Sequence, residues 1–167
     1  MRLRRKPITT AICWLLCLLC MICIFSMSAQ NAKQSDKTSS EVIKIILRIT
    51  DPKFEELSPS EQQTKIDDMQ GIVRKTTHFL IYALLGALFA QGYLCFSETP
   101  LIVIPAAILS AALYASTDEL HQTFIPGRSG ELRDIVIDSS GAILGALVSY
   151  GITRLCARVK AKNGSRS

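Results

Sequence analysis

The chain has 167 residues, of which 49% are hydrophobic and only 20% charged, and its formal net charge is +5. Its six cysteines form no disulfide framework and no two separate Cys-x-x-Cys pairs of the kind that bind zinc, which argues against both kinds of scaffold. The excess positive charge lies at the ends of apolar segments, so it indicates contact with anionic lipid and no nucleic-acid partner is expected.

The first apolar segment, residues 7–29, predicts a transmembrane helix that is retained as an anchor. A cleaved signal peptide is the alternative, because the basic stretch MRLRRK precedes it. The apolar stretch is long for a signal peptide, however, and no Ala-x-Ala cleavage site follows it. Cys13, Cys17, Cys20 and Cys23 share one helical face, which predicts a buried packing surface, with a soft-metal or redox stripe as the alternative.

Residues 30–73 form a long polar loop. Four aliphatic side chains recur there at helical spacing beside two cations, which predicts a short amphipathic helix lying on the membrane surface. They are Val42, Ile45, Ile46 and Ile49. A second helix is predicted to start at Ser58, because Ser58 and Glu61 have the spacing of a capping box. It runs toward the next apolar segment, with Gly71 as a candidate bend.

Three further apolar segments follow, at about residues 76–96, 101–121 and 134–155. Each is about 20 residues long, which spans a hydrocarbon core of about 30 Å. The segments lack strand-like alternation, and lipid accepts only helices or closed barrels. The sequence therefore predicts an all-α integral membrane protein with four transmembrane helices and a 30–73 loop that contains short surface helices.

Lys and Arg residues flank the first and last predicted spans. They are Arg2, Arg4, Arg5 and Lys6 at one end, and Arg154, Arg158, Lys160, Lys162 and Arg166 at the other. Because cytoplasmic flanks are rich in Lys and Arg, both termini are predicted to be cytoplasmic. Loop 30–73 and the 117–133 segment are then extracytoplasmic; the six Lys or Arg of loop 30–73 are offset by eight Asp or Glu.

Polar side chains occupy one face of each of the last three predicted helices, at the end nearest the 117–133 segment. They are Lys75, His78 and Tyr82; Tyr114, Asp118, Glu119 and Gln122; and Asp134 and Asp138. In the last helix the same face continues with Gly141 and Gly145, a surface on which another backbone can approach closely. Arg128 lies in the connecting hairpin, where its planar fork suits a phosphate or carboxylate group.

These motifs resemble the VanZ-like membrane protein family over nearly the whole chain. The segments that carry the resemblance are RKTTHFLIYALLGAL, STDELHQTFIPGRSGELRDIVIDSSGAILGAL and IFSMSAQNAKQSDKTSSEV. The family motifs Lys-x-x-His-x-x-x-Tyr, Glu-x-x-Gln-x-x-x-Pro-x-Arg and Asp-x-x-x-Asn-x-x-Gly-x-x-x-Gly match in order and spacing. They fall on Lys75, His78 and Tyr82; on Glu119, Gln122, Pro126 and Arg128; and on Asp134, Asp138, Gly141 and Gly145. Asp138 departs from the family, which often has Asn there, and adds a charge.

The resemblance implies one VanZ-like domain over residues 1–167, in the cytoplasmic membrane of a bacterium. It also implies a role in the cell envelope linked to low-level resistance to the glycopeptide antibiotic teicoplanin. The family brings no established molecular mechanism, so any chemistry has to be argued from the residues themselves.

Charged residues at membrane depth are costly unless paired and often mark a functional site, so we predict a ligand site. Its predicted binding residues are Lys75, His78, Tyr82, Glu119, Gln122, Arg128, Asp134 and Asp138. The candidate catalytic residues are His78, Glu119 and Asp134, and because these three lack the spacing of a metal motif, neither a metal nor another cofactor is expected. The alternative is a purely structural network that holds three helix ends together.

Three functions fit this pattern. The first is a non-enzymatic envelope protein that binds a membrane lipid, a lipid-linked envelope precursor or a drug. The second is a membrane enzyme acting on a lipid-linked, phosphate-containing substrate, with Glu119 or His78 as general base and Lys75 and Arg128 holding phosphate. The third is a small transporter or proton pathway, which the expected lack of polar groups in the inner halves of the helices argues against. The sequence indicates no oligomeric state.

Overall fold

The computed structural model describes residues 7–164, and this part of the chain is helical without strands. Its elements are α1 (Pro7–Ser28), α2 (Ala32–Thr50), the 3₁₀ helix η1 (Phe54–Glu56), α3 (Pro59–Tyr93), α4 (Pro100–Gln122) and α5 (Leu132–Gly164). Four of them, α1, α3, α4 and α5, are long and apolar enough to cross a membrane, which confirms the predicted all-α membrane fold. Arg2, Arg4, Arg5, Lys6 and Arg166 lie outside the described residues.

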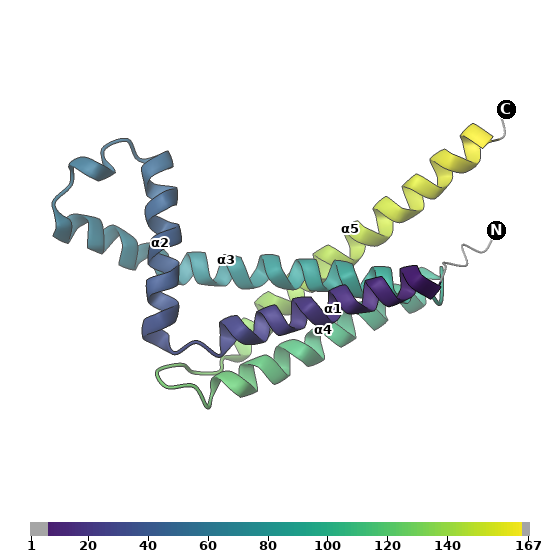
Figure 1. Cartoon of the computed structure of the whole chain (residues 1–167), viewed down its shortest axis with the longest axis horizontal. Helices are drawn as coiled ribbons and strands as arrows, with labels where there is room; N and C mark the ends of the chain where they lie inside the picture. The colour runs from purple at the N-terminus through teal and green to yellow at the C-terminus, as the bar shows by residue number, and fades with distance from the viewer. Residues whose placement is uncertain (1–6, 165–167) are drawn as a thin grey trace.

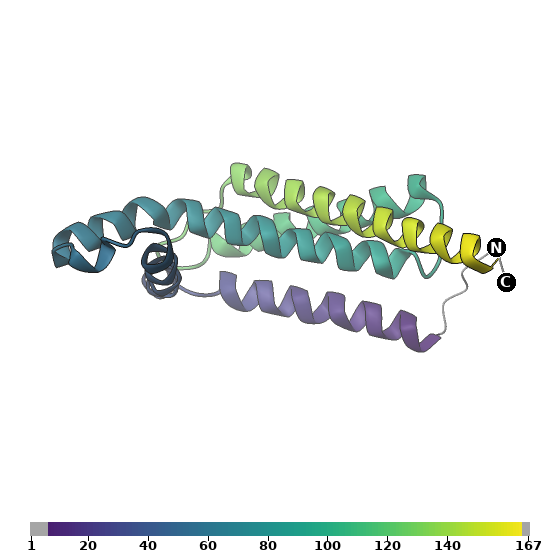
Figure 2. The ribbon, with the colours of Figure 1, turned by 90° about the horizontal axis from the view of Figure 1, so that it is seen from above.

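The four long helices form an elongated bundle (Figures 1 and 2). The start of α1 and the end of α5 lie at the same end of it, which we call the terminus end, as an even number of spans requires. The hairpin between α4 and α5 lies at the opposite end, which we call the hairpin end. Helix α2 runs across the bundle at the hairpin end, at a steep angle to the spans (Figure 1).

Helix α3 joins the helix predicted from Ser58 to the predicted span at residues 76–96. It has 35 residues and begins at Pro59, directly after Ser58, which forms a capping box with Glu61. The predicted span began at residue 76. The helix continues through Gly71, so the candidate bend does not interrupt it. Nothing in the structure packs closely around Gly71. At 1.5 Å per residue it measures about 50 Å, so it extends well beyond a hydrocarbon core of about 30 Å.

Helix α2, η1 and the first turns of α3 form a small apolar core of their own. Ile43 and Leu47 of α2 pack with Phe54 and Ile66, and all four are buried. The predicted surface stripe lies on a neighbouring face of the longer helix α2, because Val42, Ile45 and Ile49 are exposed. Helix α2 therefore has two apolar faces, one packed on the protein and one free to contact lipid.

Helices α3 and α5 cross in direct backbone contact. A side chain at Gly141 would overlap the carbonyl group of Phe79, and one at Gly145 would overlap that of Ala83. Helix α4 joins them through a buried stripe of small residues, Ala107, Ala111 and Ala115, that continues into Asp118 and Gln122. Cys17 and Cys20 of α1 are buried in this core, while Cys23 is exposed, so the cysteine stripe packs inward only in part.

The terminus end contradicts one expectation from the sequence, because polar groups do pair there. The Gln91 amide donates hydrogen bonds to the Ser149 and Thr153 hydroxyls at 2.7 and 2.9 Å. The prediction of apolar inner halves was wrong because single polar residues, spread among aliphatic ones, meet only when α3 and α5 cross.

Candidate functional site

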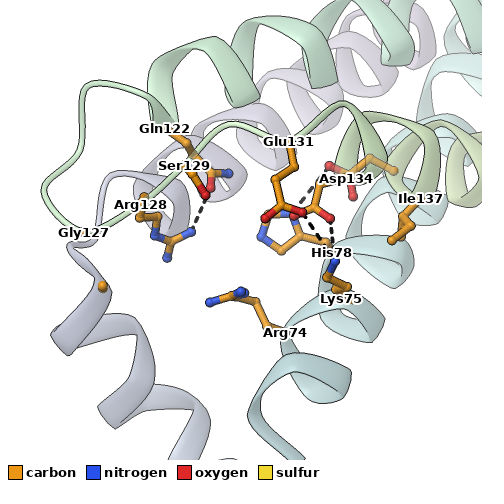
Figure 3. Close-up of a pocket in the computed structure, with 12 residues that line it drawn as sticks. Arg74, Lys75, His78, Gln122, Gly127, Arg128, Ser129, Glu131, Asp134 and Ile137 are labelled. Carbon is orange, nitrogen blue, oxygen red and sulfur yellow. Dashed lines mark hydrogen bonds and ion pairs between the residues drawn. The ribbon is translucent and has the colours of Figure 1, made fainter.

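A polar pocket opens at the hairpin end between α3, α5 and the α4–α5 hairpin (Figure 3). It has a volume of about 560 Å³, counting space open to solvent. Its charged and polar lining residues are Arg74, Lys75 and His78 from α3; Gln122 from α4; Arg128, Ser129 and Glu131 from the hairpin; and Asp134 and Asp138 from α5. The polar lining thus comes from three helices and one loop.

Three cationic side chains surround the mouth of the pocket. Lys75 forms ion pairs with Asp134 at 3.0 Å and Glu131 at 3.9 Å, so its charge is partly neutralised. Arg128 donates one hydrogen bond to the Gln122 amide oxygen at 3.1 Å, and its buried Nε has no partner among the described residues. Arg74 points into the same space from α3 (Figure 3).

The electrostatics of the hairpin favour an anion. Burial lowers the pKa of the Arg128 guanidinium, and repulsion from Arg74 lowers it further. The hairpin that carries Arg128 turns at Gly127, which has φ +77° and adopts it without strain. The Ala32 amide also donates a hydrogen bond to the Pro126 carbonyl, so the start of α2 and the hairpin are tied together. A phosphate or carboxylate entering here would relieve the Arg74–Arg128 repulsion.

The base of the pocket is acidic. His78 Nδ1 lies 3.5 Å from Asp138 Oδ2, and Asp138 is fully buried. Asp118 lies behind this pair with 3% exposure, and Ser28 at the end of α1 donates a hydrogen bond to it at 2.8 Å. Two carboxylates are thus buried beside one imidazole. At an effective dielectric constant near 20, two unit charges of the same sign about 4 Å apart repel by about 4 kcal/mol. The negative charge of the two carboxylates therefore has to be neutralised.

The helix crossing explains why these groups meet. His78 precedes Phe79, whose carbonyl touches the backbone at Gly141, and Asp138 lies one turn before Gly141. The absent Cβ at Gly141 therefore sets the separation of His78 and Asp138. Asp118 reaches the same place because it continues the small-residue stripe of α4, where alanines let that helix pack closely.

Six of the eight predicted binding residues line the pocket: Lys75, His78, Gln122, Arg128, Asp134 and Asp138. Glu119 does not. Its buried carboxylate accepts hydrogen bonds from the Glu131 amide at 2.9 Å and from Gln122 at 3.3 Å, and it thereby braces the hairpin. Tyr82 is fully buried one turn deeper in α3 and is absent from the lining. Of the three candidate catalytic residues, His78 and Asp134 face the pocket.

Sequence reasoning missed three of the nine polar lining residues, namely Arg74, Ser129 and Glu131. Arg74 precedes His78 by four residues, so it lies on the same helical face and its spacing was a usable signal. Glu131 lies in the hairpin, where no periodicity indicates which way a side chain points.

A second groove, largely apolar, adjoins the pocket. It is lined by α1, α2 and α3 through residues such as Met27, Val42 and Val73, and it shares Arg74, His78 and Arg128 with the pocket. A molecule with a polar head and an apolar chain would therefore find both environments side by side.

Comparison with known proteins places the chain in a family. A model of the VanZ/LLP1 family matches residues 13–154, which includes every residue of the pocket. No curated protein and no solved structure matches the chain. Because the family match covers far more than half of the chain, the protein belongs to the VanZ/LLP1 family.

Proposed function

We propose that the protein binds the phosphate-bearing head group of a membrane lipid or lipid-linked envelope precursor, in the pocket at its hairpin end. The protein would act in the bacterial cytoplasmic membrane with both termini in the cytoplasm, so that the pocket faces the cell envelope. By holding such a molecule it would lower susceptibility to glycopeptide antibiotics such as teicoplanin.

The observation that carries this proposal is the set of cations at the pocket mouth. Lys75 already pairs with Asp134, but Arg128 has an unpartnered buried Nε and faces Arg74. A guanidinium offers parallel N–H donors that match two phosphate oxygens, and burial strengthens such charge-assisted bonds. Phosphate therefore satisfies donors that the described residues leave unsatisfied.

The adjoining groove supports a lipid and not a free anion as the ligand. The groove opens beside Met27, Val42 and Val73 and shares Arg74 and Arg128 with the pocket. An acyl or polyprenyl chain lying there would place its phosphate between the two arginines. The exposed aliphatic face of α2, with Ile45 and Ile49, would rest in the interfacial layer beside it.

A second function, phosphate hydrolysis, is favoured by the His78–Asp138 pair at the base of the pocket. His78, oriented by Asp138, would accept a proton from water as that water attacks the terminal phosphorus of a lipid diphosphate. The bond from the bridging oxygen to that phosphorus would break, giving lipid monophosphate and inorganic phosphate. Arg74 and Arg128 would stabilise the charge on the phosphoryl oxygens.

Two measurements in a bacterial strain lacking the protein separate these functions. Restoring the gene should raise the teicoplanin concentration that inhibits growth, and the Arg128→Lys variant should not, although it is present in the membrane. Quantifying lipid-linked phosphates then distinguishes binding from catalysis: accumulation of a diphosphate in the deletion strain indicates an enzyme. If restoring the gene changes neither susceptibility nor any phosphate-bearing lipid, the proposed function is wrong.

A further inference from the structure

We infer that His78, Asp118 and Asp138 form a binding site for one divalent transition-metal cation. One ligand atom from each side chain lies within 4.8 Å of the other two. The three residues come from α3, α4 and α5, so the site is assembled only by the folded bundle. The sequence predicted no metal, because His78, Glu119 and Asp134 lack the spacing of a metal motif; this triplet is a different set of residues.

Unsatisfied oxygens point to a cation at this place. Asp118 is 3% exposed and Asp138 fully buried, yet their Oδ1 atoms have no hydrogen-bond partner among residues 7–164. The hydroxyl of Tyr82, which is fully buried and lies one turn beyond His78 on α3, likewise has no partner in the described chain. Buried polar atoms are normally bonded, so these three oxygens need an explanation.

Charge balance gives the same answer. Asp118 and Asp138 together carry a charge of −2 when ionised, and no described Lys or Arg forms an ion pair with either. The nearby Lys75 is already engaged by Asp134. A divalent cation would neutralise both carboxylates and leave His78 neutral, the form in which imidazole binds metals.

The donor set indicates which cations fit. One imidazole nitrogen with two carboxylates suits Mn²⁺, Fe²⁺ or Zn²⁺, whereas Mg²⁺ and Ca²⁺ prefer oxygen ligands alone. Ligand atoms about 2.1 Å from a common tetrahedral ion lie about 3.4 Å apart, so the triplet, whose ligand atoms lie within 4.8 Å of one another, has to contract by up to about 1.4 Å to close around a metal. Because His78 and Asp138 also line the pocket, a metal held by them would lie at the base of that pocket and would supply positive charge there.

The test is metal binding by the full chain, purified without a histidine tag and reconstituted in lipid nanodiscs. After removal of metal with a chelator, Mn²⁺ or Zn²⁺ is titrated with no phosphate ligand present, and bound metal is counted by mass spectrometry. We expect about one ion per chain and a rise in the unfolding temperature with metal concentration. Failure of both Mn²⁺ and Zn²⁺ to bind would overturn the inference and leave the two carboxylates sharing a proton.

Variants locate the ion. Asp118→Asn and Asp138→Asn should each weaken metal binding by at least about tenfold, since each removes a charged ligand. Glu98→Gln is the control: it removes a carboxylate at the terminus end that pairs with Arg154, and its metal affinity should stay near that of the wild type. Equal losses in all three variants would place the ion elsewhere and overturn the assignment.

Metal binding and phosphate binding are separable results. The titration uses the metal alone, so a positive result stands even if no lipid phosphate binds. Conversely, a protein that binds neither Mn²⁺ nor Zn²⁺ but still retains a lipid phosphate through Arg128 would refute this inference and keep the proposed function.

Discussion

Polar side chains gather at both ends of the bundle, but the two groups are built differently. At the terminus end, Arg154 pairs with Glu98 at 2.9 Å, and Gln91 donates to Ser149 and Thr153. No buried unsatisfied side-chain atom in the described chain belongs to these five residues. At the hairpin end, by contrast, unsatisfied buried atoms cluster around the pocket.

The contrast indicates which polar cluster is structural and which is a site. A network that only ties helices together is expected to satisfy its own donors and acceptors, as the terminus end does. The hairpin end leaves buried oxygens of Asp118, Asp138 and Tyr82 and the Arg128 Nε without partners, and two of these residues, Asp138 and Arg128, line an open pocket. Proteins accept such a cost where a ligand completes the arrangement.

The largest expected effect comes from the helix crossing on which both clusters depend. Gly145→Val should destabilise the protein by about 1–3 kcal/mol or more, because the new side chain overlaps the Ala83 carbonyl and forces α3 and α5 apart. Thermal unfolding in detergent measures this loss. Gly151→Ala is the control, since nothing lies within 4 Å of the position, and it should unfold at or above the wild-type temperature.

The two clusters should respond to mutation with opposite signs. In metal-free protein, Asp118→Asn should raise stability by about 0.5–2 kcal/mol, because it removes one of two buried like charges. Gln91→Ala should lower stability by about 1–3 kcal/mol, because the Ser149 and Thr153 hydroxyls lose a shared partner. Destabilisation of similar size by both changes, measured by chemical unfolding, would make the hairpin end another structural network.

The Arg154–Glu98 pair should contribute little to stability. The side chains are 39% and 29% exposed, and pairs of this kind contribute about 0–1 kcal/mol. Arg154→Ala should therefore leave membrane abundance and ligand binding close to wild type. Loss of ligand binding in this variant, measured on folded protein, would show that the terminus end takes part in function.

A small pH-dependent effect is expected outside the bundle. The hydrogen bond from Lys65 lowers the pKa of the Asp51 carboxyl, with help from the Lys53 amide. A lowered folded-state pKa stabilises the fold above the usual Asp pKa of about 3.9, and this contribution is lost as the pH falls through the folded value. Asp51→Asn should thus unfold slightly earlier than wild type at pH 7 and together with it near pH 2.

Much of this architecture was predictable from sequence because local physics determines it. The apolar lengths located four spans, and the capping box at Ser58 correctly gave the start of a helix. The prediction divided α3 into a polar helix and a span because charged residues such as Asp67 and Asp68 end a hydropathy window without ending a helix. Hydropathy indicates whether a helix lies in lipid or in water, whereas hydrogen bonding and capping determine where the helix ends.

The site was predictable only as far as helix faces and depth allow. Spacing placed Lys75, His78 and Asp138 on inward faces, and all three line the pocket. Asp118 approaches His78, whereas Glu119 turns away and supports the hairpin. This difference depends on the rotation of α4 by a fraction of a turn, which the close packing of its alanine stripe determines. The spacing of residues within α4 does not predict that rotation.

The central claim is that the hairpin end is a phosphate site and the terminus end a structural joint. Its most direct test is the affinity of nanodisc-reconstituted protein for a polyprenyl phosphate, with the matching polyprenol as control ligand, across two Arg→Lys substitutions. Lysine keeps the charge but loses the paired N–H donors, which is worth about 1.5–3 kcal/mol in a charge-assisted bond. We predict that Arg128→Lys weakens polyprenyl phosphate binding by about tenfold or more, that Arg154→Lys leaves it unchanged, and that both variants fold. Equal affinity in wild type and Arg128→Lys, or equal retention of the polyprenol, would contradict the account.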